Sequence, residues 1–242
     1  MALEQLHGFI KQYIAEPGNF FNNLNLVQAF HREPVMTTNP RILLNNDGIT
    51  LIPVFTSPEY YHHYLANLEK KGFEAIELPV AYVAEVVNEQ ELGGVILNPH
   101  TDDMVAFQRE DLNIFLSYYG SILQDLISED PEKEALYFIP GIMETKEEDQ
   151  VTRSFYTIMN PEGERYIPVF SDLKALANWY FDEGFGGEFR RQGGMIFPWT
   201  MKQFLDPATG VNSVEGTKGY VVDPFKEDRP EGQVHLWEDS KD

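Results

Sequence analysis

The chain has 242 residues and a formal net charge of −21, from 39 acidic against 18 basic side chains. A negative field of this size repels phosphate backbones and anionic lipid, so binding to nucleic acid or to a membrane surface through bulk charge is disfavoured. The apolar fraction of 43% is enough to build packed cores, which excludes a mainly disordered chain. The charge favours basic protein partners or cations, although it also serves solubility alone.

The sequence contains no cysteine. This excludes disulfides, thiolate zinc sites, iron–sulfur clusters and a cysteine nucleophile. Residues 1–19 lack a basic segment followed by a continuous apolar run, and no stretch of 18 apolar residues occurs in the chain. We therefore expect no signal peptide, no membrane span and a cytoplasmic location.

The first elements in chain order are two helices and a hairpin. Apolar residues recur at helical spacing from Leu3 to Ile14, and a second helix follows at about 20–31. Residues 40–56 have the pattern of a hairpin with polar turn residues in its middle. Pro53 in the second arm cannot donate a ladder hydrogen bond, so we expect it on an edge or at a bulge.

The hairpin is followed by a helix, for which Ser57 supplies an N-cap and Pro58 a favourable first residue. Pro79 then opens a short amphipathic helix. Gly94–Asn98 is short and continuously apolar, as buried strands are. Glu110–Ile127 carries one broad apolar stripe at helical spacing and is the strongest helix prediction.

A long-period repeat sets the architecture. Residues 45–56 (NNDGITLIPVFT) recur as residues 160–171 (NPEGERYIPVFS), with Asn, Gly, Ile, Pro, Val and Phe in register. In both places a Pro-led segment and then a Gly-led apolar run follow in the same order. Chance can produce one short match, but three ordered matches indicate two copies of one folding unit.

The second copy begins after an acidic join. Residues 136–143 (LYFIPGIM) are apolar and predict its first strand. Ser171-Asp172 can cap a helix, Pro198 is expected to open a short helix, and Gly219–Asp223 matches the buried strand of the first copy.

The predicted fold class is mixed α/β (α+β), with two duplicated modules that each form a small mixed sheet with flanking helices. The predicted boundaries are a first module at 1–127, an acidic connecting segment at 128–150 that includes the first strand of the second module, a second, divergent module at 151–225, and a flexible acidic tail at 226–242.

Three segments in order, LIPVFTSPEYYHHYL, AIELPVAYVAEVV and GGVILNP, resemble the N-terminal domain of the SseB-like (enhanced serine sensitivity) family. The resemblance covers roughly residues 20–116, with a weaker second copy at about 135–225. It implies a bacterial, cytosolic α/β module and brings no catalytic residues. The second half departs from the longer family members, whose C-terminal half looks different.

Motifs for chemistry are mostly missing. Neither a phosphate-binding glycine loop nor a G-x-S-x-G elbow occurs. The adjacent His62 and His63 would point about 100° apart on a helix, which does not suit one metal. The segment NPHTDD at 98–103 could hold a hard cation, but its residues are those of an ordinary turn, which we favour. We predict no catalytic residue, no metal and no cofactor.

The candidate binding residues lie where strands end and helices begin. Ligands bind at the carboxyl ends of strands in open α/β sheets, and aromatic residues are enriched at the centres of interfaces. For the aromatic residues on the helices we favour a place in the core, with a recognition patch as the alternative. The candidate partner- or ligand-binding residues are Phe55, Thr56, Tyr60, Tyr64, Asn98, His100, Phe170, Ser171, Trp179 and Asp223.

These observations favour a non-enzymatic protein-binding or adaptor module, although an enzyme is not excluded. The alternative is a small-molecule-binding protein or degenerate enzyme with a cleft between the two modules. A third hypothesis is self-association through an exposed strand edge near Pro53 or Pro168.

Overall fold

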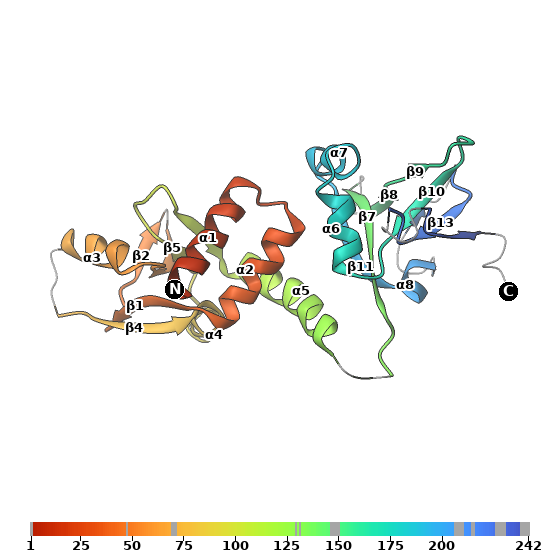
Figure 1. Ribbon diagram of the computed structural model, residues 1–242. Coiled ribbons are helices and arrows are strands. Elements are labelled where there is room, and N and C mark those ends of the chain that lie inside the picture. Colours follow the sequence, from red (N-terminus) through yellow and green to blue (C-terminus); the bar gives the residue numbers. More distant parts are fainter. Residues whose placement is uncertain are drawn as a thin grey trace. The chain divides into compact units, whose positions relative to one another are not determined.

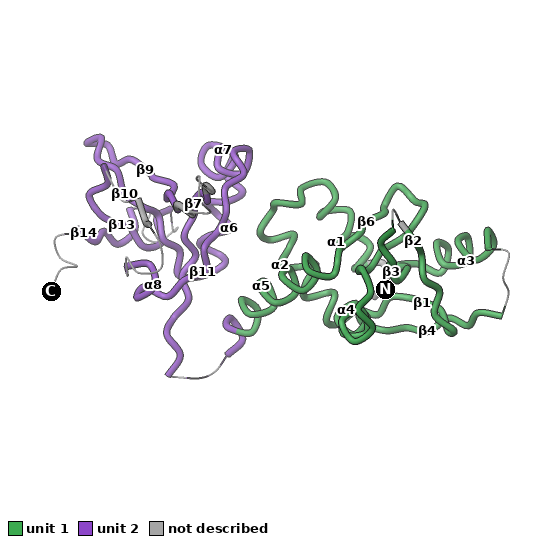
Figure 2. The backbone as a smooth tube through the Cα atoms, turned by 180° about the vertical axis from the view of Figure 1, so that it is seen from behind, with its two compact units in different colours: residues 1–124 green, residues 125–242 purple. Residues whose placement is uncertain are grey.

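The computed structural model describes residues 2–46, 48–68, 72–128, 130, 132–145, 151–205, 211–213, 216–225 and 231–237. It divides into two compact units, residues 1–124 and residues 125–242 (Figure 2). Both units combine helices with small sheets, so the predicted mixed α/β class is confirmed (Figure 1). In the described part of the chain, no helix combines the length and the apolar character needed to cross a membrane.

Unit 1 opens with two helices, and α5 closes it. The helices are α1 (Ala2–Ala15), α2 (Phe20–Arg32), α3 (Pro58–Ala66), α4 (Val80–Glu89) and α5 (Arg109–Ile127). The strands are β1 (Pro34–Asn39), β2 (Leu44–Asn46), β3 (Ile49–Val54), β4 (Glu74–Pro79), β5 (Gly94–Leu97) and β6 (Val105–Gln108). The predictions of α1, α2, α3, α4, β5 and α5 are confirmed, whereas β1 was not predicted.

The strands of unit 1 form two sheets. One has the order β2-β3-β5-β6, with β3 and β5 parallel and the outer pairs antiparallel. In the other, β1 pairs with β4 antiparallel. A single bridge joins the two sheets: Met36 N donates to Phe55 O (2.9 Å) and Phe55 N donates to Met36 O (2.8 Å).

Pro53 explains why this contact stops at one bridge. The next ring of an antiparallel ladder beyond Met36–Phe55 would need an N–H from residue 53, which proline lacks. Pro53 is buried and lies in β3, with β5 paired along its other side. The expectation of an edge strand or a bulge is therefore wrong, because β3 lies inside its sheet. The missing N–H of Pro53 is tolerated because it would lie on the side of β3 that faces β1.

The main core of unit 1 lies between its helices and the four-stranded sheet. Apolar side chains at helical spacing on α1, α2 and α4 pack on alternate residues of β3 and β5. The side chains that are almost fully buried here include Leu6, Ile10, Leu26, Phe30, Ile52, Val54, Val80, Val87, Val95 and Leu97.

Unit 2 has shorter helices than unit 1. The helices are α6 (Leu173–Tyr180), α7 (Gly186–Arg191) and α8 (Met201–Leu205). The strands are β7 (Leu136–Thr145), β8 (Val151–Phe155), β9 (Ile158–Met159), β10 (Arg165–Val169), β11 (Met195–Thr200), β12 (Val211–Ser213), β13 (Gly219–Val222) and β14 (Gln233–Leu236). They form two sheets, with the orders β14-β13-β10-β9 and β11-β7-β8-β12.

The strand pairing of unit 1 recurs in unit 2. The strands β10 and β13 are parallel, as β3 and β5 are, and β9 and β14 flank them antiparallel, as β2 and β6 do. One bridge again joins this sheet to the other one, between Phe138 and Phe170. Pro168 lies two residues before Phe170, as Pro53 lies before Phe55, and it is also buried. Neither proline marks an exposed edge, so the self-association hypothesis loses its starting point.

Two expectations for unit 2 are corrected. Pro198 does not open a helix, because it pairs with Phe138 within β11, and α8 begins only at Met201. β11 is an edge strand, where a missing N–H can face away from the sheet. In the predicted tail, β14 pairs with β13, because β13 offers a free edge to the chain that returns. Residues 226–230 and 238–242 of that tail lie outside the described residues.

Gly94 and Gly219 begin the equivalent strands β5 and β13, and their substitution tests the strand pairing that the two units share. A Cβ at Gly94 would fall on the carbonyl oxygen of Phe107, and a Cβ at Gly219 would fall on that of His235. Because backbone atoms of a paired strand cannot move aside, we expect Gly94→Ala and Gly219→Ala each to destabilise the fold by at least about 1–3 kcal/mol. Thermal unfolding followed by circular dichroism measures this.

The matched control is Gly8→Ala, in α1, where a Cβ meets nothing within 4 Å. Alanine has the higher helix propensity, so this change should stabilise the chain by up to about 1 kcal/mol. Equal melting temperatures for Gly94→Ala and the control would contradict the close strand packing.

Candidate functional site

The carboxyl ends of β3 and β5 are joined by two buried polar side chains. Asn98, directly after β5, accepts a hydrogen bond from the backbone N–H of Thr56 (2.9 Å). Its amide nitrogen also donates to Thr56 Oγ1 (2.9 Å). Asn98 has a φ of +48°, a left-handed conformation that asparagine tolerates better than most residues. The two side chains thus fasten the chain where it leaves the parallel strands.

Unit 2 has the same arrangement with a carboxylate in place of the amide. Asp223, directly after β13, has a φ of +49° and is buried. It accepts from Ser171 N (2.7 Å) and from Ser171 Oγ (2.6 Å). In both units the backbone N–H of this residue donates to the last residue of the neighbouring parallel strand, over 2.8 Å. The predicted residues Thr56, Asn98, Ser171 and Asp223 therefore meet in two equivalent pairs.

A second left-handed residue follows two positions later in each unit. His100 has a φ of +63°, and its ring stacks on Tyr64 of α3, with centroids 5.8 Å apart and planes 14° apart. Phe225 has a φ of +68°, and its ring lies 4.3 Å from that of Phe185. A bulky residue at positive φ is strained, and such strain persists where the surrounding structure holds it. Both strand ends therefore present a ring in a constrained position.

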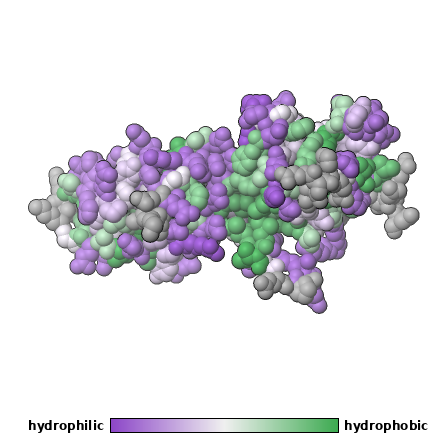
Figure 3. All heavy atoms as spheres, viewed as in Figure 1, coloured by the Kyte–Doolittle hydropathy of each residue, from purple (hydrophilic) through white to green (hydrophobic). Residues whose placement is uncertain are grey.

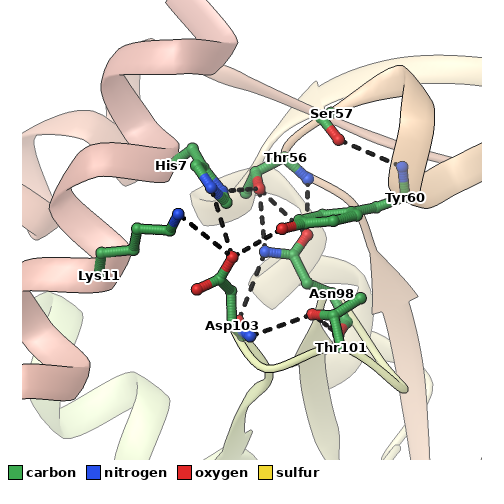
Figure 4. Close-up of polar contacts among 8 residues, drawn as sticks. All are labelled: His7, Lys11, Thr56, Ser57, Tyr60, Asn98, Thr101 and Asp103. Atoms are coloured by element: carbon green, nitrogen blue, oxygen red, sulfur yellow. Dashed lines mark hydrogen bonds and ion pairs between the residues drawn. The ribbon is translucent and has the colours of Figure 1, made fainter.

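Unit 1 has a cluster of polar and charged side chains at the carboxyl ends of β3 and β5. Tyr60 Oη donates to Asp103 Oδ2 (2.6 Å), and the same oxygen lies 3.4 Å from His7 Nε2 and 3.6 Å from Lys11 Nζ (Figure 4). His7 and Lys11 are one turn apart on α1, directly after the buried Leu6 and Ile10. Burial of the apolar face of α1 thus carries its two basic side chains to the strand ends.

The electrostatics of the cluster centre on the carboxylate. Donation to Asp103 is the largest cause that raises the pKa of Tyr60 to about 12, and desolvation and the nearby negative charges of Asp103, Glu59 and Asp102 raise it further. Because this pKa is higher in the folded chain than the ordinary 10.0, the interaction stabilises the fold fully below pH 10. That contribution is lost as the pH rises toward 12.

Thr56, His7 and Asp103 follow one another like a nucleophile, a base and its orienting acid. His7 Nδ1 lies 3.0 Å from Thr56 Oγ1. However, Thr56 is only 1% exposed, and its hydroxyl is also within 3.1 Å of both side-chain polar atoms of Asn98. A substrate cannot reach a hydroxyl that is enclosed in this way. We therefore assign Thr56 to the frame of the fold.

The other predicted site residues have mainly packing contacts. Phe55 packs against Tyr64, which is largely buried, and Phe170 packs against Trp179, which is 1% exposed. Among the predicted site residues of unit 1, only Tyr60 and His100 are at least partly exposed to solvent. Among the described residues no group of three or more His, Cys, Asp or Glu side chains could hold a metal ion.

Sequence reasoning missed His7, Lys11 and the role of Asp103. The signal for the first two was present, since they follow Leu6 and Ile10 at the same helical spacing. Nothing local, however, connects α1 to the turn after β5, because the residues are far apart in the chain. Asp103 was considered only as a cation ligand within its own turn.

The strand-end frame gives a stability prediction. Asn98→Ala removes the acceptor of the buried Thr56 N–H and places alanine in a left-handed conformation, so we expect a loss of about 2–4 kcal/mol. The control is Asn88→Ala, since Asn88 pairs with Asn113 on the surface and its loss should cost little. Thermal unfolding of both variants tests this. A loss of stability in Asn98→Ala as small as that in Asn88→Ala would show that the frame is not important for stability.

The cluster gives a pH prediction. Subtracting the alkaline titration of Tyr60→Phe from that of the parent chain, followed by tyrosinate absorbance, should isolate one ionisation near a pKa of about 12. Asp103→Asn should move that ionisation back toward 10, because the charged acceptor is gone. An unchanged pKa in Asp103→Asn would mean that Tyr60 does not donate to Asp103 in solution.

Comparison with known proteins gives one family match. The SseB protein N-terminal domain matches residues 127–225, which is less than half of the chain and lies in unit 2. The match confirms the resemblance at about 135–225, and the resemblance at residues 20–116 stays a prediction.

Two solved structures are similar to this chain at low identity. Anabaena Tic22 (protein transport) is 11% identical, covers 86% of this chain and 94% of its own, and has a TM-score of 0.27. Tic22 from Plasmodium falciparum is 11% identical, with coverages of 78% and 90% and a TM-score of 0.24. At such scores the likeness says nothing about function. No curated protein matches the sequence.

Proposed function

We propose that this protein is a non-enzymatic module that binds another protein and consists of two copies of one SseB-like folding unit. The family match in unit 2 supports the SseB-like nature of one copy. The equivalent strand pairing, the single bridge beside a proline and the hydroxyl–Asn/Asp pair support its extension to unit 1. The bacterial origin and the cytoplasmic location stay predictions from the sequence.

The two units act as an internal comparison. Features that both units share, such as Thr56 with Asn98 and Ser171 with Asp223, have the task of holding the fold. The observation that carries the proposal lies at this strand end in unit 1, where Tyr60, His7 and Lys11 assemble on Asp103 (Figure 4). A buried hydroxyl argues against chemistry there, and exposed side chains around it argue for recognition.

The proposed contact surface is the outer part of this strand end. The side chain of Lys11 is 56% exposed, His100 is exposed, and Tyr60 and His7 are partly exposed. Cations and aromatic rings on a preformed frame lose little entropy on binding, which suits a protein partner. Tyr60 and His100 are the predicted residues that remain in this surface, with His7 and Lys11 added.

An affinity purification from lysate of the source cells tests the proposal. The tagged full chain should retain one stoichiometric partner, and Lys11→Gln with His100→Ala should reduce its recovery by about tenfold, because both side chains belong to the proposed contact. The control is Lys174→Gln with His62→Ala, which removes the same types of exposed residue elsewhere.

Equal recovery by both double variants would contradict the proposed surface. Recovery of the chain alone, with a thermal shift by a metabolite, would instead support the small-molecule alternative. A ligand at 100 times its dissociation constant should stabilise the chain by about 2.7 kcal/mol.

A further inference from the structure

The strand β4 has one side without a neighbouring strand. In the two-stranded sheet β1 pairs along one side of β4, and no strand of the described residues pairs along the other side. Figure 1 shows β4 at the lower rim of unit 1, beneath β1. The 6 residues Glu74–Pro79 therefore form an edge strand, and the backbone of such a strand is a template for pairing with another chain.

The bridge between the two sheets of unit 1 fixes which backbone groups of β4 point outward. Met36 exchanges its N–H and C=O with Phe55, so both groups of Met36 face β3. Met36 lies opposite Glu77 in the ladder of β1 and β4. In such a pair both residues turn their backbone groups away from each other, so the N–H and C=O of Glu77 point to the free side. By alternation along the strand, those of Ala75 do so as well.

The equivalent edge of unit 2 is closed at its centre. Phe138, which forms the bridge there, lies opposite Pro198 of β11, so Pro198 takes the place of Glu77. Proline has no N–H, and the outward N–H of Thr200 already donates to Gln203 Oε1 (2.9 Å). In unit 1 the central position has a donor, because glutamate keeps its N–H.

The side chains of β4 define the two faces that an added strand would meet. Leu78 packs against the main core of unit 1, and the half-buried Ile76 lies on the same face. Ala75 and Glu77 are exposed on the opposite face. Hydrophobic and hydrophilic residues lie side by side along this rim in Figure 3. An added strand would therefore cover apolar side chains on one face and meet a carboxylate on the other.

Charge determines which kind of strand fits. Opposite charges directly across two strands are favourable, and like charges are not. A second copy of the chain would bring its own Glu74 and Glu77 to this edge, together with its net charge of −21. An extended segment with lysine or arginine on the face of Glu77 and apolar residues in between complements both faces.

We propose that the free edge of β4 binds such a basic, alternating segment of a partner protein as an additional strand. Backbone hydrogen bonds to Ala75 and Glu77 would supply affinity, and the alternating side chains would supply specificity. This surface uses no residue of the strand-end cluster, so either proposal can fail alone.

A synthetic peptide tests the proposal on the full chain. The probe is a fluorescent peptide of about eight residues in which valine and lysine alternate, and its binding is followed by anisotropy. We expect saturable binding. It should weaken when the salt is raised from about 50 mM to about 300 mM, because charge attraction is screened.

Two methylated peptides are the matched controls, since an added strand turns only every second residue toward its neighbour. One peptide is methylated on the backbone nitrogens of its lysines and the other on those of its valines. The peptide that loses the donors facing β4 should bind at least about tenfold more weakly, whereas the other should stay within about threefold of the parent probe. An antiparallel strand is sensitive in its lysines and a parallel one in its valines.

A variant of the chain closes the edge. Glu77→Pro removes the outward N–H and leaves the bonds to β1, so it should weaken the probe at least about tenfold. Glu77→Gln removes only the charge and should weaken it by about threefold. The control is Glu110→Gln, which removes an exposed carboxylate from the first turn of α5 and should leave the affinity within about twofold.

Four results would overturn the proposal. They are the absence of saturable binding, an equal effect of methylation on the two peptides, unchanged affinity of a Glu77→Pro variant that melts at the temperature of the parent chain, and a dimer, detected by sedimentation, that Glu77→Pro dissolves. If Glu77→Pro lowers the melting temperature, the two methylated peptides decide the question on the unaltered chain.

Discussion

The buried hydrogen bond at the end of the parallel strands is the constraint on which the rest of the arrangement depends. The buried Thr56 N–H in unit 1 would be unsatisfied without Asn98, and Asp223 plays the same part for the partly buried Ser171 N–H in unit 2. A buried unpaired N–H costs more than an ordinary hydrogen bond contributes, so the side-chain acceptor is a requirement of the fold. The left-handed backbone of the acceptor then directs the following turn, which carries His100 and Phe225 to their positions.

The second constraint is that proline has no backbone N–H to donate. Pro53 and Pro168 limit the contact between the sheets of their units to one bridge each, beside Phe55 and Phe170. The two sheets of a unit can therefore diverge after this point. At the bridge, α3 packs on Phe55 through Tyr64, and α6 packs on Phe170 through Trp179. The same aromatic residues then serve the core. This explains why the conspicuous P-V-F signature in the sequence belongs to the architecture.

Function is best sought in the side chains that surround this frame in unit 1. In unit 1, α1 brings His7 and Lys11 to Asp103. This cluster lies beside the buried hydrogen bonds of Thr56 and Asn98, and a preformed arrangement lowers the entropic cost of binding a partner. The proposed role in protein binding rests on this arrangement.

The sequence by itself determined the elements whose signal is local. The periodicity of α1, α2 and α5, the cap of Ser57 and the short apolar runs of β5 and β13 depend on residues within one or two turns of each other. The match between residues 45–56 and 160–171 also indicated that one pattern occurs twice. The sequence also identified Thr56, Asn98, Ser171 and Asp223 as candidate binding residues, because each follows a predicted strand.

Only the tertiary structure decided which of these residues meet and which are enclosed. The contact of His7 with Thr56 and that of Tyr60 with Asp103 join residues more than 40 positions apart. The pairing of β1, the strand at Pro198 and the return of β14 likewise depend on which sheet edge is open to the chain. Such choices depend on burial and hydrogen bonding across the whole unit, and local spacing has no information on them.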